Sequence, residues 1–312
     1  METGVLLPVA SLPDGTFKTG YAFVDFLRKN NFHYWQILPL NPRDDYGSPY
    51  NSPNSLSIDR GYGTKKEWLT LKKYANAKGI KIIGDVPYFI TPQEKKDLFI
   101  KGLYAGAPPD AYSKKGQYWG LPVFDWHDRF DQNMTHLLKR LKLATELYDV
   151  IRLDHFRGYC ALWAVPKPYK SGRRGHWLKV PGDKIMKKIR EKFPKTTFIA
   201  ENLGVITPNV EILRRKYQLL GSKVLIWHRN SLVKKDEVLY SSVHDSNTLL
   251  GHTKKVAHVK KLIAEGKRTK AAIFIFAMQD ILGLGSSARL NKPGKKSGNW
   301  KWRLTNDDLR VG

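Results

Sequence analysis

The chain has 312 residues, of which 41% are apolar, so it is long enough to bury one large core, and we expect a single domain over residues 1–312. Its one cysteine, Cys160, excludes an internal disulfide framework and a cysteine metal site. No run approaches the roughly 20 apolar residues of a membrane span and the N-terminus lacks a signal-peptide pattern, so we expect a cytoplasmic protein without a membrane partner.

Short apolar runs alternate with segments of helical period along the chain. The predicted strands are 4–7, 34–40, 80–90, 150–158, 197–204, 223–228, 237–243 and 271–282. The predicted helices are 22–30, 64–78, 134–147, 182–192, 208–217 and 254–265. Buried strands that alternate with helices predict an α/β fold, the (β/α)8 TIM barrel, with function at the C-terminal strand ends. Two stretches without helical period, about 101–128 and 286–303, are predicted to be ordered loop insertions over that face.

Acidic residues stand at or just past the ends of five predicted strands. They are Asp85, Asp154, Glu201, Asp245 and Asp280. An unpaired carboxylate is expensive to bury. The repeated placement therefore predicts that these strand ends converge on one polar site.

Three of these carboxylates and one arginine indicate a chemistry. Arg152 and Asp154 share a face of one strand, and the cation keeps the carboxylate ionised, as a nucleophile must be. Glu201 ends the next strand, and a strand spacing of about 4.8 Å suits the roughly 5–5.5 Å between the two carboxyls of a retaining glycosidase. Asp245, preceded by His244, would raise the pKa of Glu201 toward that of a working acid. An inward Arg–Asp pair is equally typical of a structural salt bridge, so both interpretations stay open.

Aromatic residues occur in the predicted loops on the carboxylate side. They lie within 47–50, 118–120 and 299–302. Each Trp alone is better explained by local packing, but sugar rings bind through their CH faces on aromatic side chains. Together with three carboxylates, these residues favour a glycan cleft.

Charge offers a competing interpretation. The chain has 54 Lys and Arg against 28 Asp and Glu, a formal net charge of +26, which promotes attraction to nucleic acid. The basic residues are scattered, often as Lys pairs in helix-like stretches. A solvated basic exterior is favoured over a dedicated nucleic-acid surface, since an inward acidic set would repel phosphate.

A series of motifs runs through the chain. It comprises Trp35-Gln-Ile-Leu-Pro-Leu with Gly47-Ser-Pro-Tyr50, Gly84-Asp-Val-Pro87, Pro108-Pro-Asp110 with Gly116-Gln-Tyr-Trp-Gly120, Arg152-Leu-Asp-His-Phe-Arg-Gly158, Ala200-Glu-Asn-Leu-Gly-Val-Ile-Thr-Pro208, His244-Asp-Ser-Asn-Thr248, and Ala288-Arg-Leu-Asn291 through Ser297-Gly-Asn-Trp300. In order and approximate spacing these motifs resemble the 4-α-glucanotransferase family (amylomaltase, or disproportionating enzyme).

The resemblance implies a (β/α)8 enzyme that cleaves an α-1,4-glucosidic bond with retention and passes the glycosyl unit, through a covalent glycosyl-enzyme, to the 4-hydroxyl of an acceptor. By motif position, Asp154 would be the nucleophile, Glu201 the general acid/base and Asp245 the transition-state stabiliser. Arg152 and His244 would contact the sugar. Further implied glucan-binding residues are Ser48, Tyr50, Asp85, Asp110, Gln117, Trp119, Asn291 and Ser297. The substrates would be maltooligosaccharides and α-1,4-glucans; no metal or organic cofactor is implied, and we expect a monomer.

The chain also departs from the family pattern. Between 57–60 and Thr64 relatives carry an extra helical subdomain that is absent here, and the region before Ala271 is short. A more open cleft would admit water to the glycosyl-enzyme. The sixth strand ends Trp227-His-Arg-Asn230, and Leu121 replaces the usual Asn after Trp-Gly. The alternatives are therefore a retaining α-1,4-glucan hydrolase with weak transfer, or a glucan-binding pseudoenzyme.

Overall fold

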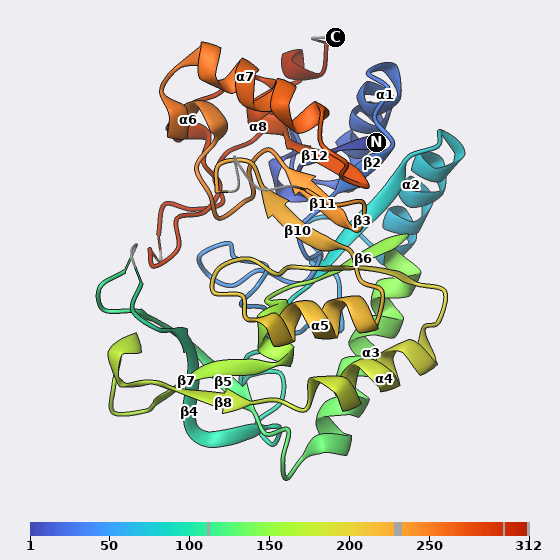
Figure 1. The fold of residues 1–312 in the computed structure, drawn as a ribbon. Coiled ribbons are helices and arrows are strands. Elements are labelled where there is room, and N and C mark those ends of the chain that lie inside the picture. The colour runs from blue at the N-terminus through green and yellow to red at the C-terminus, as the bar shows by residue number, and fades with distance from the viewer. Residues whose placement is uncertain (111–112, 228–232, 296, 311–312) are drawn as a thin grey trace.

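Eight parallel strands form the centre of the molecule, a computed structural model that describes residues 1–110, 113–227, 233–295 and 297–310 (Figure 1). The strands are β1 (Glu2–Leu6), β2 (Tyr34–Gln36), β3 (Lys81–Val86), β6 (Val150–Leu153), β9 (Thr197–Ala200), β10 (Gly221–Val224), β11 (Glu237–Tyr240) and β12 (Ile273–Ala277). Their order is β10-β11-β12-β1-β2-β3-β6-β9, and a parallel bridge between Ile199 and Leu220 joins the two ends of the sheet. The predicted barrel is confirmed, and each strand falls within or beside a predicted run.

Helices alternate with the strands around the barrel. They are α1 (Gly20–Lys29), α2 (Lys65–Ala77), α3 (Phe130–Leu147), α4 (Gly182–Lys192), α5 (Pro208–Lys216), α6 (Leu249–Thr253), α7 (Val256–Lys267) and α8 (Met278–Ile281). Thr64 and Glu67 form a reciprocal capping box at the start of α2. The chain therefore passes directly from residue 60 into α2, at the position where an extra subdomain is predicted to be missing.

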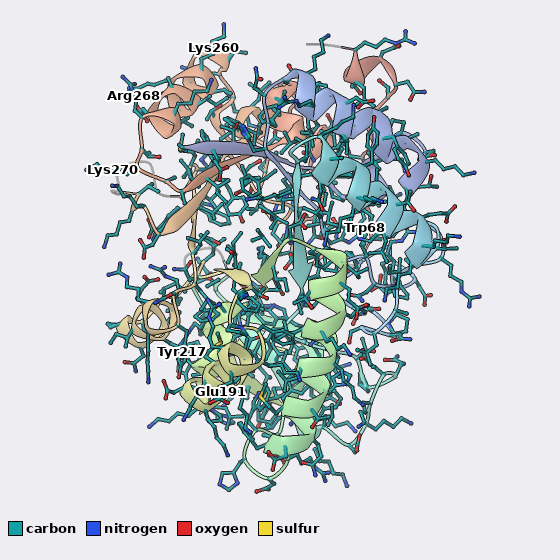
Figure 2. The ribbon with its side chains drawn as sticks, turned by 90° about the vertical axis from the view of Figure 1, so that its right-hand side faces the viewer. Trp68, Glu191, Tyr217, Lys260, Arg268 and Lys270 are labelled. Carbon is teal, nitrogen blue, oxygen red and sulfur yellow. The ribbon has the colours of Figure 1, made fainter. Side chains whose placement is uncertain are left out.

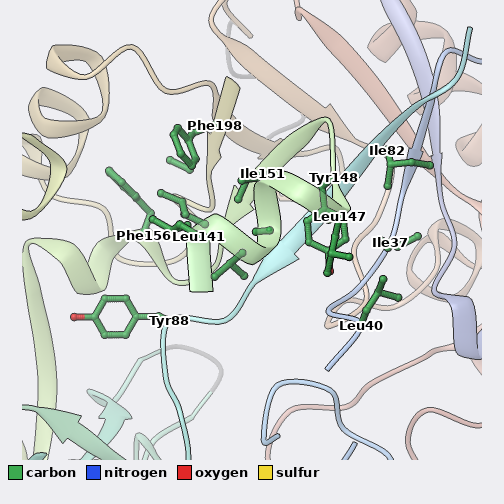
Figure 3. Close-up of a cluster of buried hydrophobic side chains, with 14 of the residues drawn as sticks. Ile37, Leu40, Ile82, Tyr88, Leu141, Leu147, Tyr148, Ile151, Phe156 and Phe198 are labelled. Carbon is green, nitrogen blue, oxygen red and sulfur yellow. The ribbon is translucent and has the colours of Figure 1, made fainter. Parts of the chain in front are cut away.

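The core lies between the barrel strands and the surrounding helices. Ile82, Ile151 and Phe198 project from neighbouring strands and are fully buried, and Figure 3 shows Ile151 and Phe198 grouped with Leu141 of α3. Strands covered on both faces need side chains of this kind, which explains their nearly continuous apolar runs. None of the described helices is long and apolar enough to cross a membrane.

A second, antiparallel sheet lies beside the barrel, at the bottom of Figure 1. It consists of β4 (Phe99–Ala107), β5 (Gln117–Phe124), β7 (Ala161–Pro166) and β8 (His176–Lys179), in the order β5-β4-β7-β8. We call it the accessory sheet. The stretch 101–128, predicted to be a loop, thus contains most of one strand and all of another. The stretch 286–303 contains a single 3-10 turn, Ser286–Ala288, and no strand among its described residues.

Candidate active site

Asp154 and Glu201 lie side by side at the C-terminal ends of β6 and β9. The strands are paired up to Leu153 and Ala200, and each carboxylate residue follows directly. The Glu201 amide donates to the Leu153 carbonyl at 3.1 Å, and the Phe156 amide donates to the Glu201 carbonyl at 3.0 Å. These bonds extend the pairing beyond the strands and hold both residues in register. The predicted separation of the two carboxyl groups stays a prediction.

Arg152 is shared between two carboxylates. Its Nη1 lies 3.1 Å from Asp154 Oδ1 and also donates to Asp85 Oδ2. The Asp85 side chain is 0% exposed, whereas that of Asp154 is 22% exposed. The structural salt bridge is thus formed between Arg152 and Asp85. Asp154 contacts the same arginine but remains accessible, as the interpretation as a nucleophile requires.

Tyr50 connects this ion-pair cluster to the loop after β11. Its hydroxyl donates to Asp85 Oδ2 at 2.6 Å, and its ring stacks on His244 with centroids 5.0 Å apart. Asn291 donates from Nδ2 to Asp245 Oδ1 at 2.5 Å and from its amide to the His244 carbonyl at 3.0 Å. Five of the predicted site residues are thus linked to one another from four separate segments of the chain.

The pKa of Glu201 is raised to about 8. Burial is the largest cause, because it disfavours the charged carboxylate; Arg152 opposes the rise, and the charges of Asp154 and Asp245 add to it. The predicted direction is confirmed, but burial contributes more to it than Asp245, the cause predicted from the sequence. A carboxyl group that is protonated at neutral pH can act as a general acid.

Trp119 is connected to Asp154 through His155, a residue that was not among the predicted site residues. His155 directly follows Asp154 in a left-handed backbone conformation, with φ of 46°, and its ring centroid is 5.2 Å from that of Trp119. The Trp119 indole donates to Gln117 Oε1 at 3.0 Å. Burial lowers the pKa of His155 to about 4, so its imidazole is neutral at pH 7.

Asp280 does not join the other carboxylates, so the prediction that all five converge is wrong for this residue. Its Oδ2 accepts from the hydroxyls of Ser241 and Ser242 at 2.7 and 2.6 Å, and its Oδ1 accepts from the Leu249 amide at 2.6 Å. These residues bracket the loop that carries Asp245. Asp280 is therefore a buried anchor of that loop, and Arg289 supports the same loop by donating to the Asp245 carbonyl at 2.6 Å.

Three further predicted residues, Ser48, Asp110 and Ser297, lie in loops. Ser48 Oγ accepts from the Tyr50 amide at 3.3 Å, whereas Asp110 and Ser297 are exposed loop residues whose glucan contacts stay predictions. Trp302 packs against the hydrophobic core, so local packing explains it.

Two departures from the family pattern are the segment 227–230 and Leu121. Of the segment 227–230, residues 228–230 lie outside the described residues, and Leu121 is half-buried against the hydrophobic core. Among the described residues, no group of three or more His, Cys, Asp or Glu side chains is placed to hold a metal ion.

Known proteins resemble the chain in sequence and in structure. The family model for 4-alpha-glucanotransferase matches residues 7–63 and 61–308, and the two matches meet where the subdomain is predicted to be missing. The 4-alpha-glucanotransferases of Thermus thermophilus and Aquifex aeolicus are each 35% identical over 78% of this chain and 58% of their own length. The chain thus spans less than two thirds of these relatives. An amylomaltase from Streptococcus agalactiae, solved with acarbose, shares the fold with a TM-score of 0.90 at 23% identity, over 99% of this chain and 96% of that one.

Proposed function

Because the chain belongs to the 4-alpha-glucanotransferase family, we propose that it cleaves α-1,4-glucosidic bonds with retention and transfers the glycosyl unit to the 4-hydroxyl of a second glucan. The observation that carries the proposal is the pair of neighbouring carboxyl groups in unlike environments. Asp154 is paired with Arg152 and accessible, and Glu201 has a pKa of about 8. A carboxylate held by an arginine beside a carboxyl group whose pKa is raised suits a nucleophile and an acid.

In the first step, Asp154 attacks the anomeric carbon and forms a glycosyl ester. Arg152 holds Oδ1 of this carboxylate, so we assign the attack to Oδ2. Glu201 donates its proton to the departing glycosidic oxygen, and the shortened glucan leaves with a new 4-hydroxyl.

In the second step, the Glu201 carboxylate takes the proton of the acceptor 4-hydroxyl as that oxygen attacks the anomeric carbon. The bond between this carbon and Asp154 breaks. Asp154 is released as the carboxylate, and both groups return to their starting protonation states. Asp245, held by Asn291, stabilises the positive charge that develops on the sugar ring in both steps.

Hydrolysis is the alternative function, in which water replaces the acceptor glucan. The chain enters α2 at its Thr64 cap without the subdomain that relatives are expected to carry there. Transfer exceeds hydrolysis only when the acceptor is positioned and water is excluded. With fewer walls around the acceptor, water should compete for the glycosyl-enzyme.

Maltotriose separates the candidates. Transfer yields longer oligomers and glucose without a net rise in reducing ends, whereas hydrolysis raises the number of reducing ends. A glucan-binding pseudoenzyme would yield neither product. Absence of any product from the folded protein would contradict both enzymatic candidates, and a dominant net rise in reducing ends at low acceptor concentration would replace transferase with hydrolase.

A further inference from the structure

Aromatic side chains form a row across one face of the accessory sheet. Gly106 of β4 pairs with Tyr118 of β5 and with Trp163 of β7, which in turn pairs with Trp177 of β8. Directly paired residues in an antiparallel sheet project from the same face. The rings of Trp163 and Trp177 are 5.2 Å apart, and Tyr104, two residues before Gly106, contacts Tyr118 at 5.7 Å. We call these four rings the aromatic row.

The outer end of the aromatic row is open to solvent. Trp177 is 41% exposed, and Tyr169, in the loop between β7 and β8, is 44% exposed. Both rings belong to the β7–β8 hairpin, and the Arg174 guanidinium of the same hairpin lies 5.8 Å from the centroid of the Tyr169 ring. The planar faces of the two rings suit a sugar ring or another flat, partly apolar group.

Arg157 has an unmet hydrogen-bonding group beside this open end. Its guanidinium lies 3.9 Å from the centroid of the Trp177 ring, the residue is only 9% exposed, and its Nε has no hydrogen-bond partner. Within the described parts of the chain it forms no ion pair. A cation that is buried without a carboxylate remains uncompensated, so an anion supplied by a ligand would be stabilised there.

The sequence around Arg157 is also positively charged. Residues 155–182 contain no Asp, Glu, Asn or Gln. Their basic residues are Arg157, Lys167, Lys170, Arg173, Arg174 and Lys179. Lys114 and Lys115 lie next to them, because their carbonyls accept from Arg173 and Ser171 at 3.1 and 2.9 Å. A neutral sugar is usually held by carboxylate and amide side chains, whereas this surface offers rings and cations, which suit an anionic ligand.

We propose that this surface binds an α-glucan chain that carries phosphate esters, with sugar rings on Trp177 and Tyr169, phosphate oxygens accepting from the exposed Arg174, and the charge of Arg157 stabilising the phosphate. The identification of a glucan rests on the proposed function. It is favoured over a nucleic acid because β5, an edge strand of the accessory sheet, carries Tyr118 on the face of the aromatic row and Trp119 of the candidate active site on the opposite face, so one glucan chain could pass around this edge and reach both.

The test compares maltoheptaose that carries one phosphate ester with unmodified maltoheptaose. Binding is measured by calorimetry in the Asp154→Asn background, which prevents turnover. We expect the phosphorylated sugar to bind about tenfold more tightly, and this preference to weaken as salt is raised. Trp177→Ala and Arg174→Gln should each remove most of the preference. Arg174 is exposed, so its variant tests the site without loss of packing.

The matched control is Lys260→Ala, which removes one exposed positive charge from α7, at the opposite end of the molecule from the accessory sheet (Figures 1 and 2). It should keep the preference. In the otherwise unmodified chain, Trp177→Ala should also leave maltotriose conversion unchanged, so the surface and the active site are tested separately.

Three results with the two sugars would overturn the proposal. They are equal affinity for the two sugars, a preference that survives Trp177→Ala and Arg174→Gln, and a preference that Lys260→Ala removes. Tighter binding of an oligouridylate than of the phosphorylated sugar would identify the partner as nucleic acid and would also overturn it. If the chain fails to convert maltotriose but shows the expected binding, the proposed function fails and the surface site stands.

Discussion

Two arginines near the end of β6 differ in how their charge is compensated. Arg152 is 5% exposed and lies between the carboxylates of Asp85 and Asp154. Arg157 is 9% exposed and lies over the ring of Trp177, without an acidic partner among the described residues. The first arginine belongs to the barrel face and the second contacts the accessory sheet.

In the free protein the charge of Arg152 is therefore compensated by acidic side chains, whereas no described acidic side chain compensates that of Arg157. The buried Arg152 cation has its counter-charges in place, so it can orient Asp154 before any substrate arrives. Arg157 has a ring on one side and no acidic partner among the described residues, so the proposed anionic ligand would supply the missing counter-charge. Compensated charge therefore indicates a preorganised catalytic group here, and uncompensated charge indicates a binding surface.

The largest expected effect follows from removing the proposed nucleophile. Asp154→Asn keeps the shape of the side chain, so it should lower turnover of maltotriose by more than about a thousandfold while the protein stays folded. Initial rates and circular dichroism measure the two quantities. Turnover near the unmodified level would show that Asp154 is not the nucleophile.

The second prediction compares the two arginines directly. Arg152→Met leaves the fully buried Asp85 carboxylate without its cation and should destabilise the protein by about 3–5 kcal/mol. Arg157→Met leaves no carboxylate behind and should change stability by about 1 kcal/mol or less. Urea unfolding at pH 7 measures both. Equal losses would show that the charge environments of the two arginines are less different than their contacts indicate.

The third prediction concerns the acid. The pKa of Glu201 is raised to about 8, so the carboxyl group loses the proton that the proposed mechanism requires as pH rises through about 8. Turnover of maltotriose should therefore fall on the alkaline side, by about tenfold for each further pH unit. A glycosyl fluoride needs little protonation of its leaving group, so Glu201→Gln should damage its conversion far less than that of glucans. Equal losses on both substrates would exclude Glu201 as the acid.

The same shift has a consequence for stability. The unfolded carboxyl has a pKa near 4.5, so between that value and about 8 the folded state binds more protons than the unfolded state. The contribution of Glu201 is fully present below pH 4.5 and is lost as pH rises toward 8. Glu201→Gln should flatten the decline of the unfolding free energy over this window. An unchanged decline would show that other groups cause it.

The barrel could be predicted because its strands are buried on both faces and therefore read as apolar runs. The accessory sheet could not. Gly102 and Gly106 interrupt β4, the pairing of β4 with β5 shifts register twice, and Pro108 and Pro109 follow, so this stretch has the local pattern of a loop. Its strands are specified by pairing with β7, residues 161–166, which are distant in sequence.

The contacts of the candidate site could be predicted where they join residues close together in the sequence, but not where they join distant segments. Arg152 and Asp154 share a strand face, so their contact follows from spacing. The anchor role of Asp280 depends on two serines 38 and 39 residues away, and nothing in the local pattern distinguishes it from Asp245. The main cause of the raised Glu201 pKa is burial, which only the packed structure reveals.

The smallest expected effect tests that anchor. Asp280→Asn replaces one accepting oxygen by a donor, so it should break at least one of the bonds to Ser241, Ser242 or Leu249 and cost about 1–3 kcal/mol of stability. The loop that carries Asp245 would shift, and small misplacements of catalytic groups lower turnover, here by about tenfold.

The control for this prediction is Asp14→Asn, which makes the same change in an exposed residue that accepts three hydrogen bonds from Thr16 and Thr19. It should leave kcat on maltotriose unchanged. Rates are compared well below the unfolding temperature of each variant, so that the folded fraction does not limit them. Because Asp280 acts through the position of Asp245, its variant should lower kcat more than it raises KM. If kcat of Asp280→Asn matches that of Asp14→Asn, the anchor stabilises the fold without positioning Asp245, and the chain of contacts from Arg152 through Tyr50 to His244 is sufficient to hold the site.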